Sequence, residues 1–202
     1  AFNYYGTNPN CDSKVFLKLL DMDCKPEQVN NYNYTALMCA FEYYGNNPNC
    51  DSKVFLKLLD MDCKPEHINN YGSTVLMYAF RYYGGNKNYN SQVLLKLLDM
   101  DCNPDRINND NWTALMYALR YYGRNKNCNS TVLLKLLDMD CKTGHADNGN
   151  WTALIYAFQY YRLEDLSPIE KILDLLNKNH CRTKDKYNSD VFLHACKFSY
   201  PT

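Results

Sequence analysis

Apolar residues along this chain fall at helical spacing in short segments, which are separated by stretches rich in asparagine, glycine and proline. Between Trp112 and Tyr122, apolar positions occur at i, i+3, i+4 and i+7, the spacing of one face of an α-helix: Leu115, Ala118, Leu119 and Tyr122. A second segment, Thr131 to Met139, has an apolar face made of Val132, Leu133, Leu136 and Leu137. The pattern therefore predicts two short amphipathic helices joined by a polar connection.

Polar residues mark the ends of these two helices. The preceding stretch, 104–111, contains turn formers and too little apolar content for a helix, which predicts a projecting finger loop or a short hairpin. Thr113 is expected to cap or begin the first helix, Gly123 to end it in a left-handed conformation, and Ser130 to cap the second helix. The Asn-rich connection 124–129 is most simply a solvated loop.

This pattern repeats at a fixed interval. Tyrosine and aspartate recur every 39 residues, at Tyr5, Tyr44, Tyr83, Tyr122 and Tyr161 and at Asp21, Asp60, Asp99 and Asp138. A fixed period of this kind identifies a stacked array of small units. Because such short helices are marginal alone, each unit must bury its apolar stripe against a neighbour. Four of the recurring tyrosines, Tyr44, Tyr83, Tyr122 and Tyr161, are expected in the core. The tyrosine before each, at positions 43, 82, 121 and 160, is expected to be exposed.

The unit resembles the ankyrin repeat. The residues Asn-Trp-Thr-Ala-Leu-Met at 111–116 match the family's Gly-x-Thr-Pro-Leu-His turn, and Ala118 and the Leu136-Leu137 pair follow. The resemblance covers essentially the whole chain and implies an all-α ankyrin-repeat solenoid of about five stacked helix-turn-helix units with projecting finger loops. The family period is about 33 residues, so about six extra residues lie in the connection between the two helices. At the family's glycine position the chain has Asn33, Gly72, Asn111 and Asn150, and asparagine tolerates a positive φ best after glycine.

We expect one array over residues 1–202. Its parts are a partial first unit (1–30), three central units (31–69, 70–108 and 109–147), a divergent unit (148–187) and a terminal half unit (188–202). The first residues correspond to the end of a first helix, so the chain is expected to be a fragment of something longer.

Composition and charge narrow the function classes. Basic and acidic residues number 22 each, so there is no electrostatic footprint for nucleic acid or an anionic membrane. No run approaches the roughly 18 apolar residues of a membrane span, and no targeting segment begins the chain. Most cysteines follow the repeat and none forms a Cys-x-x-Cys pair, which favours reduced thiols over disulfides or a metal site. We expect a monomeric cytoplasmic protein.

No constellation of residues points to an enzyme. The four histidines, His67, His145, His180 and His194, lie at unrelated positions without a nucleophile or carboxylate at a catalytic spacing. There is no phosphate-cradling glycine-rich loop. We therefore expect no catalytic residues, no metal and no cofactor.

Aromatic and arginine residues form the stronger signal. The resemblance implies that finger tips and the exposed side of the first helices line a concave binding surface. Tryptophan, tyrosine and arginine are enriched among the residues that dominate interfaces. We expect Trp112 and Trp151 to be anchors and Arg81 and Arg120 to be charge or stacking partners. The complete set of expected partner-binding residues is Tyr32, Tyr34, Tyr43, Tyr71, Arg81, Tyr82, Trp112, Arg120, Tyr121, Trp151, Gln159 and Tyr160.

Three functional hypotheses follow. The first is a non-enzymatic module that binds a partner protein. Its composition is similar to that of arrays from intracellular pathogens and large DNA viruses, which suggests an effector that engages a host protein in the host cytosol. The second is the substrate-targeting part of a larger enzyme, such as a ubiquitin-ligase adaptor. The third is a methyl-lysine reader, in which Trp112, Trp151 and nearby tyrosines form a cage of facing rings with an acidic neighbour.

Overall fold

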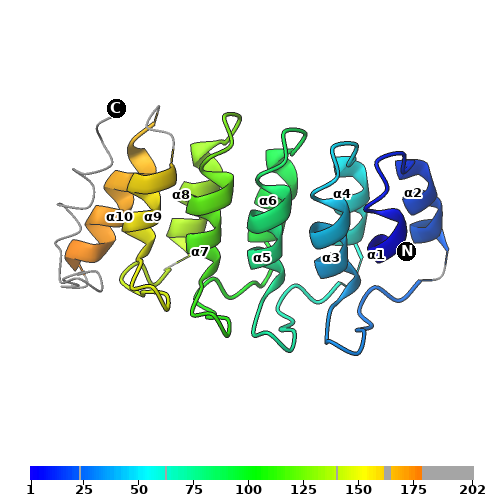
Figure 1. Ribbon diagram of the computed structural model, residues 1–202, viewed down its shortest axis with the longest axis horizontal. Helices are drawn as coiled ribbons and strands as arrows, with labels where there is room; N and C mark the ends of the chain where they lie inside the picture. Colours follow the sequence, from blue (N-terminus) through cyan, green and yellow to red (C-terminus); the bar gives the residue numbers. More distant parts are fainter. Residues whose placement is uncertain (23, 62, 140, 162–164, 179–202) are drawn as a thin grey trace.

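Pairs of helices stand side by side in one elongated stack (Figure 1). The computed structural model describes residues 1–22, 24–61, 63–139, 141–161 and 165–178. Successive pairs are joined by loops that project from one long edge of the stack, and the two helices of a pair are joined at the opposite edge (Figure 1). The predicted terminal half unit, 188–202, lies outside the described residues.

Two helices alternate along the chain, as predicted. The first helices are α1 (Phe2–Tyr5), α3 (Ala36–Cys39), α5 (Val75–Tyr78), α7 (Ala114–Tyr117) and α9 (Ala153–Tyr160). The second helices are α2 (Ser13–Asp21), α4 (Ser52–Leu59), α6 (Ser91–Leu98), α8 (Ser130–Asp138) and α10 (Ser167–Lys178). Between the gaps left at residues 23, 62, 140 and 162–164, the described chain contains isolated antiparallel bridges but no strand. The all-α stacked array is therefore confirmed.

Three of the first helices, α3, α5 and α7, continue into a π-helical turn that the apolar spacing does not predict. These turns are η1 (Ala40–Tyr44), η2 (Ala79–Tyr83) and η3 (Ala118–Tyr122). The Gly123 amide donates to the Ala118 carbonyl over 2.8 Å, five residues back. The predicted left-handed conformation of Gly123 is wrong, because its φ is −61° and its ψ is −21°. Glycine is required there for space, since a Cβ would lie 2.7 Å from the Leu119 carbonyl oxygen and 2.9 Å from the Tyr161 ring.

The helix caps are partly as predicted. Thr113 caps α7, and its hydroxyl accepts a hydrogen bond from the Met116 amide over 3.3 Å. The helix begins at Ala114, two residues later than the predicted start at Trp112. The predicted cap of α8, Ser130, is wrong by one residue, because the Asn129 side chain accepts from the Thr131 amide over 2.9 Å. A side-chain oxygen one residue before the helix reaches the free amides of its first turn.

The finger loops are short hairpins, as predicted. The expected positive φ angles are confirmed at Asn33 (66°), Gly72 (72°), Asn111 (62°) and Asn150 (61°). Neighbouring fingers join through their backbones, because the Asn109 amide donates to the Tyr71 carbonyl over 3.0 Å. This bond extends the contact between units beyond the helices and holds the finger tips in a row.

Each buried tyrosine connects the core to the start of a second helix. Tyr44, Tyr83 and Tyr122 are fully buried, which confirms their predicted core position. The hydroxyl of each accepts the backbone amide of the residue that caps the following helix; for Tyr83 this is Asn90, at 2.8 Å. A buried hydroxyl needs a hydrogen-bond partner. Because the partner here is the backbone of the helix cap, the bond also holds the connection between the two helices in place.

The prediction that the Asn-rich connections are solvated holds only in part. Most residues of the connection 124–129 are exposed, but one asparagine in each of three connections, Asn47, Asn86 and Asn125, is buried or half-buried. Asn47 and Asn86 are only 4% and 8% exposed. The Asn86 side-chain amide donates to two carbonyls of the preceding unit, those of Gly45 (2.8 Å) and Asn47 (2.7 Å). Asn47 and Asn125 make the equivalent pairs of bonds to their own preceding units. The lengthened connection therefore supplies a row of asparagines that ties successive units together.

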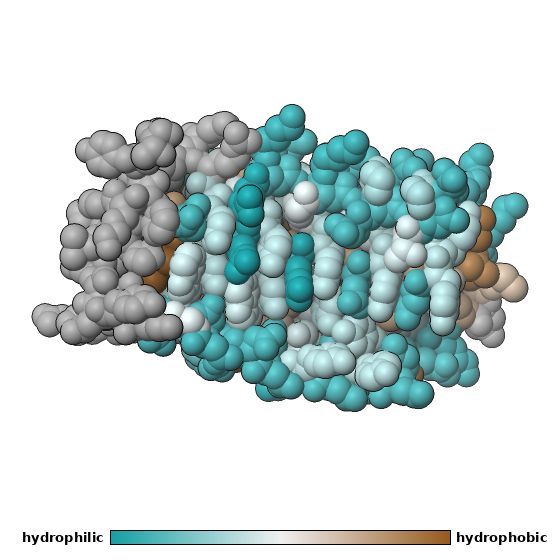
Figure 2. Space-filling view, viewed as in Figure 1, coloured by the Kyte–Doolittle hydropathy of each residue, from teal (hydrophilic) through white to brown (hydrophobic). Residues whose placement is uncertain are grey.

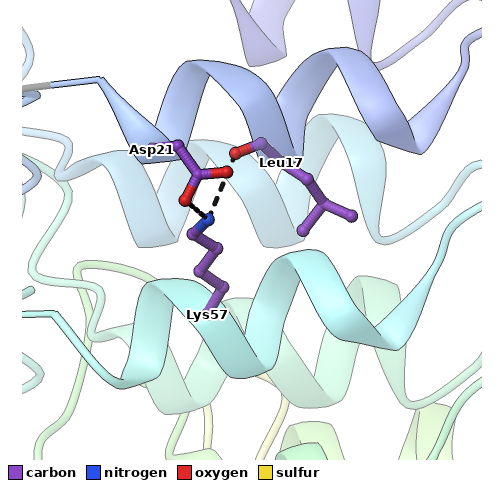
Figure 3. Close-up of polar contacts among 3 residues, drawn as sticks. All are labelled: Leu17, Asp21 and Lys57. Carbon is purple, nitrogen blue, oxygen red and sulfur yellow. Dashed lines mark hydrogen bonds and ion pairs between the residues drawn. The ribbon is translucent and has the colours of Figure 1, made fainter.

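Ion pairs link the second helices in a similar row. Lys57 of α4 contacts the Asp21 carboxylate, and its Nζ donates to the Leu17 carbonyl of α2 over 3.3 Å (Figure 3). The cation thus lies at the C-terminal end of the preceding helix, where the helix dipole favours positive charge. The other pairs in the row are Lys96–Asp60, Lys135–Asp99 and Lys171–Asp138.

Candidate functional site

Aromatic side chains line the face formed by the first helices. Figure 2 shows pale aromatic groups standing side by side across this face, with strongly hydrophilic groups between them. In three successive units an inner tyrosine stacks on a tyrosine four residues later. The ring centroids are 5.8 Å apart for Tyr78–Tyr82, 6.1 Å for Tyr117–Tyr121 and 6.0 Å for Tyr156–Tyr160. We call this surface the first-helix face; it comprises Tyr34, Tyr78, Arg81, Tyr82, Trp112, Tyr117, Arg120, Tyr121, Trp151, Tyr156 and Tyr160.

The inner tyrosines are fixed by the finger loops. The Asn69 side chain donates to the Tyr78 hydroxyl over 3.0 Å, and its oxygen accepts the amides of Tyr71 and Ser73. In a later unit the Tyr156 hydroxyl donates to the Asp147 carboxylate over 2.6 Å. Burial raises the pKa of Tyr156, and the hydrogen bond to Asp147 raises it further. In three fingers, one polar side chain thus holds both the turn and a ring of the face.

These inner tyrosines were not among the predicted site residues. Tyr78, Tyr117 and Tyr156 follow the 39-residue period, so their recurrence in the sequence was an available signal. Their role was hidden because they are 2–8% exposed. They act beneath the outer rings and set the position of those rings.

The two tryptophans are packed into the face. The Trp112 ring lies 4.8 Å from the Tyr117 ring of its own unit and 4.8 Å from Tyr156 of the next unit. The Trp151 ring lies 5.2 Å from Tyr156. Both tryptophans are half-buried. Trp112 therefore joins two units as well as contributing to the surface.

The arginines lie over aromatic rings of their own unit and of the next one. The Arg81 guanidinium carbon is 5.0 Å from the Tyr82 centroid and 5.7 Å from Tyr117. Arg120 is 5.2 Å from the Trp112 ring and 5.6 Å from Tyr160. All four distances are within the cation–π range. Arg81 and Arg120 are expected to stack on groups of a partner, and here they stack on aromatic rings of the chain itself.

The packing of these rings and arginines determines how much of each predicted site residue is exposed to solvent. The prediction that Tyr43, Tyr82, Tyr121 and Tyr160 are exposed is wrong, because all four are half-buried. Three of them lie against an inner tyrosine and an arginine. Tyr32 and Tyr71, at the finger tips, are 61% and 51% exposed. Gln159 is half-buried at the far end of the face. The structure thus brings the predicted residues onto one face, with the finger tips as its most accessible part.

The aromatic cage proposed around the two tryptophans already contains a cation. Arg120 lies over Trp112 and within 6.0 Å of the Tyr156 centroid. The acidic neighbour, Asp147, accepts the Tyr156 hydroxyl. A methylated lysine would have to displace the chain's own arginine, which argues against a reader site at these rings.

A hollow lies at the other end of the face, around Glu42. Its volume is about 320 Å³, and its lining residues are Asn3, Asn30, Tyr32, Tyr34, Glu42, Tyr43 and Tyr71. Burial raises the pKa of the Glu42 carboxyl, and Arg81 acts in the opposite direction. We call this hollow the Glu42 pocket.

Other candidate chemistry can be located. The imidazole Nε2 atoms of His67 and His145 lie 3.0 and 3.1 Å from the carbonyls of Asn33 and Asn111, so both histidines contact the finger of the preceding unit. His180 and His194 lie outside the described residues. Within the described part of the chain, no three His, Cys, Asp or Glu side chains converge as metal ligands would. No helix there has the length and apolar character to cross a bilayer.

Comparisons with known proteins identify the family to which this chain belongs. No curated protein sequence matches the chain significantly. Three similar solved structures have low sequence identity. An ankyrin repeat domain from Acinetobacter baumannii AYE is 20% identical, with 81% of this chain and 74% of that chain covered and a TM-score of 0.55. A chain in the complex of a predatory endopeptidase from Bdellovibrio bacteriovorus with an immunity protein is 20% identical, with 98% and 92% covered and a TM-score of 0.60. The ankyrin repeat protein EF0377 is 19% identical, with 98% and 90% covered and a TM-score of 0.61.

At these identities the structures establish the fold alone. The family model for ankyrin repeats, in three copies, matches residues 85–185. Ankyrin repeats are in general protein–protein interaction modules. Together with the stacked helix pairs and their finger hairpins, this match shows that the chain belongs to the ankyrin repeat family.

Proposed function

We propose that this chain is a non-enzymatic module that binds a partner protein through the first-helix face and the finger tips. The observation that carries the proposal is the continuous row of tyrosine, tryptophan and arginine across successive units. Side chains already held by stacking lose little conformational freedom when a partner binds, so less of the interaction energy is lost to ordering. Such residue types also dominate the binding energy of protein interfaces.

The exposed finger-tip tyrosines support the same surface. Tyr32 and Tyr71 belong to adjacent fingers, and Asn70 of the second finger donates its amide to the Tyr32 carbonyl over 3.2 Å. Two large aromatic side chains are thus presented together from a hydrogen-bonded row of turns. Tyrosine offers a partner both an apolar ring and a hydroxyl.

Within this proposal the module acts as a monomer in the cytosol, and its partner is a host protein. The support is the composition, which is rich in tyrosine, asparagine and lysine. A pull-down from host-cell lysate, with quantification by mass spectrometry, is the direct test.

The test compares one surface with another. The variants are the double change Tyr32→Ser/Tyr71→Ser and the single change Arg81→Glu, all at exposed positions. Lys53→Glu, at an exposed position of α4, is the matched charge reversal on a second helix. We expect at least about a tenfold loss of specific capture for the first two variants, the loss typical of a hot-spot residue. The Lys53→Glu variant should capture the wild-type set. Equal capture by all variants would contradict the proposal, provided that thermal unfolding shows each to be folded.

A further inference from the structure

Glu42 occupies the position that arginine holds in the next two units. Arg81 and Arg120 follow it at successive intervals of 39 residues. Each arginine lies over the following tyrosine of its own unit and over an inner tyrosine of the next unit. The corresponding rings beside Glu42 are those of Tyr43 and Tyr78. Here a carboxylate stands where the chain elsewhere places a guanidinium.

The hydrogen-bonding capacity of the Glu42 carboxylate is not satisfied. Its Oε2 atom is buried from solvent and has no hydrogen-bond partner. None of the ion pairs within the described chain involves Glu42. Arg81 lowers the pKa of the Glu42 carboxyl by its charge, yet its guanidinium lies over Tyr82 and Tyr117. A buried acceptor without a donor is costly, and the cost is larger for a charged group.

The surroundings of Glu42 suit a flat cation. Four tyrosines, Tyr32, Tyr34, Tyr43 and Tyr71, line the Glu42 pocket with it. The Tyr34 and Tyr71 rings meet edge to face, with centroids 6.3 Å apart and an angle of 81° between their planes. The volume of about 320 Å³ is near the lower end of the range for ligand pockets. It is large enough for one side chain from a partner and too small for a folded element.

We propose that the Glu42 pocket binds an arginine side chain of the partner protein. The guanidinium pairs with the Glu42 carboxylate and lies against the tyrosine rings, as Arg81 and Arg120 lie against the rings of their own units. Arginine fits better than lysine because its planar guanidinium can donate to the carboxylate and stack on an aromatic face at the same time. This proposal rests on the proposed function, since the arginine belongs to the protein that the first-helix face binds.

The closing experiment uses small probes of the side chain. N-acetyl-arginine methylamide is titrated into the isotope-labelled chain, and the tyrosine and backbone resonances are followed by NMR. The matched probe is N-acetyl-citrulline methylamide, which has nearly the same shape without the charge. The corresponding lysine and trimethyl-lysine derivatives complete the set. We expect saturable shifts at Tyr34, Tyr43 and Tyr71 with the arginine probe, and binding at least about fivefold weaker for lysine and citrulline.

Two variants test the role of the carboxylate. Glu42→Gln should weaken binding of the arginine probe about tenfold, because it keeps the shape and removes the charge. Glu42→Arg should fill the pocket from within, as in the next two units, and abolish probe binding while the chain stays folded. The proposal is overturned if citrulline binds as tightly as arginine, if trimethyl-lysine binds more tightly, or if Glu42→Gln leaves arginine binding unchanged.

The same variants separate this proposal from the proposed function. If partner capture is lost in the finger-tip variant but persists with Glu42→Gln, the face binds a protein and the arginine assignment is wrong. If the arginine probe binds but no first-helix-face variant alters capture, the pocket is real and the proposed function is wrong.

Discussion

The side-chain amide of Asn86 donates to the backbone carbonyl of Gly45 over 2.8 Å, and so joins two consecutive connections. A second bond from the same amide reaches the Asn47 carbonyl at 2.7 Å, and the Asn86 oxygen accepts the Asn88 amide at 2.9 Å. Asn86 therefore uses both ends of its side chain while almost completely buried. The lengthened connection of this family member has a structural use, which is to bond each unit to the one before it.

Replacing Asn86 with alanine should destabilise the stack. Two carbonyls and one amide would lose their partner, and each unsatisfied buried polar group costs about 1 to 3 kcal/mol. Because water can reach part of the vacated space, we expect a net loss of about 2 to 3 kcal/mol in the free energy of unfolding. Urea unfolding followed by circular dichroism measures it. Asn46→Ala, at an exposed position in the connection of the preceding unit, is the control and should change stability by less than about 0.5 kcal/mol. Equal effects of the two changes would show that the asparagine row contributes nothing.

Tyr82 and Tyr83 are adjacent, but loss of the hydroxyl should affect stability at Tyr83 and not at Tyr82. The Tyr83 hydroxyl is buried and accepts the Asn90 amide at 2.8 Å, so Tyr83→Phe leaves that amide without its partner. We expect a cost of about 1 to 2 kcal/mol. The Tyr82 hydroxyl forms no hydrogen bond within the described residues, and a phenylalanine ring still accepts the Arg81 cation. Tyr82→Phe should therefore lie within about 0.5 kcal/mol of the wild type. Thermal unfolding of both variants checks the difference, which would vanish if the Asn90 bond were weak.

The repeat period predicted most of the fold because it fixes which residues face a neighbour. Leu115, Ala118, Leu119 and Tyr122 repeat at helical spacing and are all buried. The positive φ at Asn33, Asn111 and Asn150 was predictable for a related reason, since few residues other than glycine tolerate that backbone conformation. Such local and periodic constraints are visible in one sequence.

Contacts between units could not be predicted in the same way. An asparagine in a polar connection looks solvated until the carbonyls beside it are known, and those of Gly45 and Asn47 come from the previous unit. The π-helical turn that ends three of the first helices adds one residue without changing the apolar spacing before it. Prediction of the candidate site from the sequence is limited in the same way. The sequence identified Arg81 and Trp112 as surface residues, but only the stacked units reveal that the chain's own rings and arginines already pair.

Gly84 and Gly85 differ in the space available to a side chain. A Cβ on Gly84 would lie 3.0 Å from both the Phe80 carbonyl oxygen and the Tyr122 Cβ, whereas the nearest atoms to a Cβ on Gly85 are 3.9 Å away. Gly84 has a right-handed conformation, so local propensity alone would favour alanine there. We expect Gly84→Ala to cost about 1 to 3 kcal/mol through overpacking against the next unit. Gly85→Ala should be neutral or stabilise by up to about 1 kcal/mol. Stabilisation by both changes in chemical denaturation would mean that the units are less tightly packed than the distances indicate.

The Lys57–Asp21 pair should contribute little and should depend on salt. The Asp21 side chain is 69% exposed, and exposed ion pairs contribute about 0 to 1 kcal/mol. A double-mutant cycle with Lys57→Met and Asp21→Asn isolates the coupling energy. We expect less than about 1 kcal/mol at low ionic strength, and a smaller value at 1 M salt. The single change Lys57→Met should cost more than Asp21→Asn, because Lys57 also donates to the Leu17 carbonyl. Coupling that is unaffected by salt would contradict a solvent-exposed pair.

Glu42 should make stability fall as the pH rises. Burial raises the pKa of its carboxyl in the folded state, so the folded chain binds more protons than the unfolded chain between the ordinary and the raised pKa. The free energy of unfolding therefore decreases as the pH rises through that window, which begins near the ordinary glutamate pKa of about 4.3. Glu42→Gln removes this dependence.

The midpoint temperature of Glu42→Gln should accordingly rise relative to the wild type between pH 4 and pH 7, with the smallest difference at the acid end. The attraction between Glu42 and Arg81 opposes this trend and reduces it without reversing its sign, because burial is the larger cause of the shift. Glu66→Gln, at an exposed position, is the control for loss of one carboxylate from the surface. A difference between Glu42→Gln and the wild type that stays constant with pH, or shrinks towards neutrality, would show that the folded chain does not disfavour the charged form of Glu42. Addition of the arginine probe should raise the midpoint of the wild type most where Glu42 is ionised, which links the pH profile to the binding of a cation.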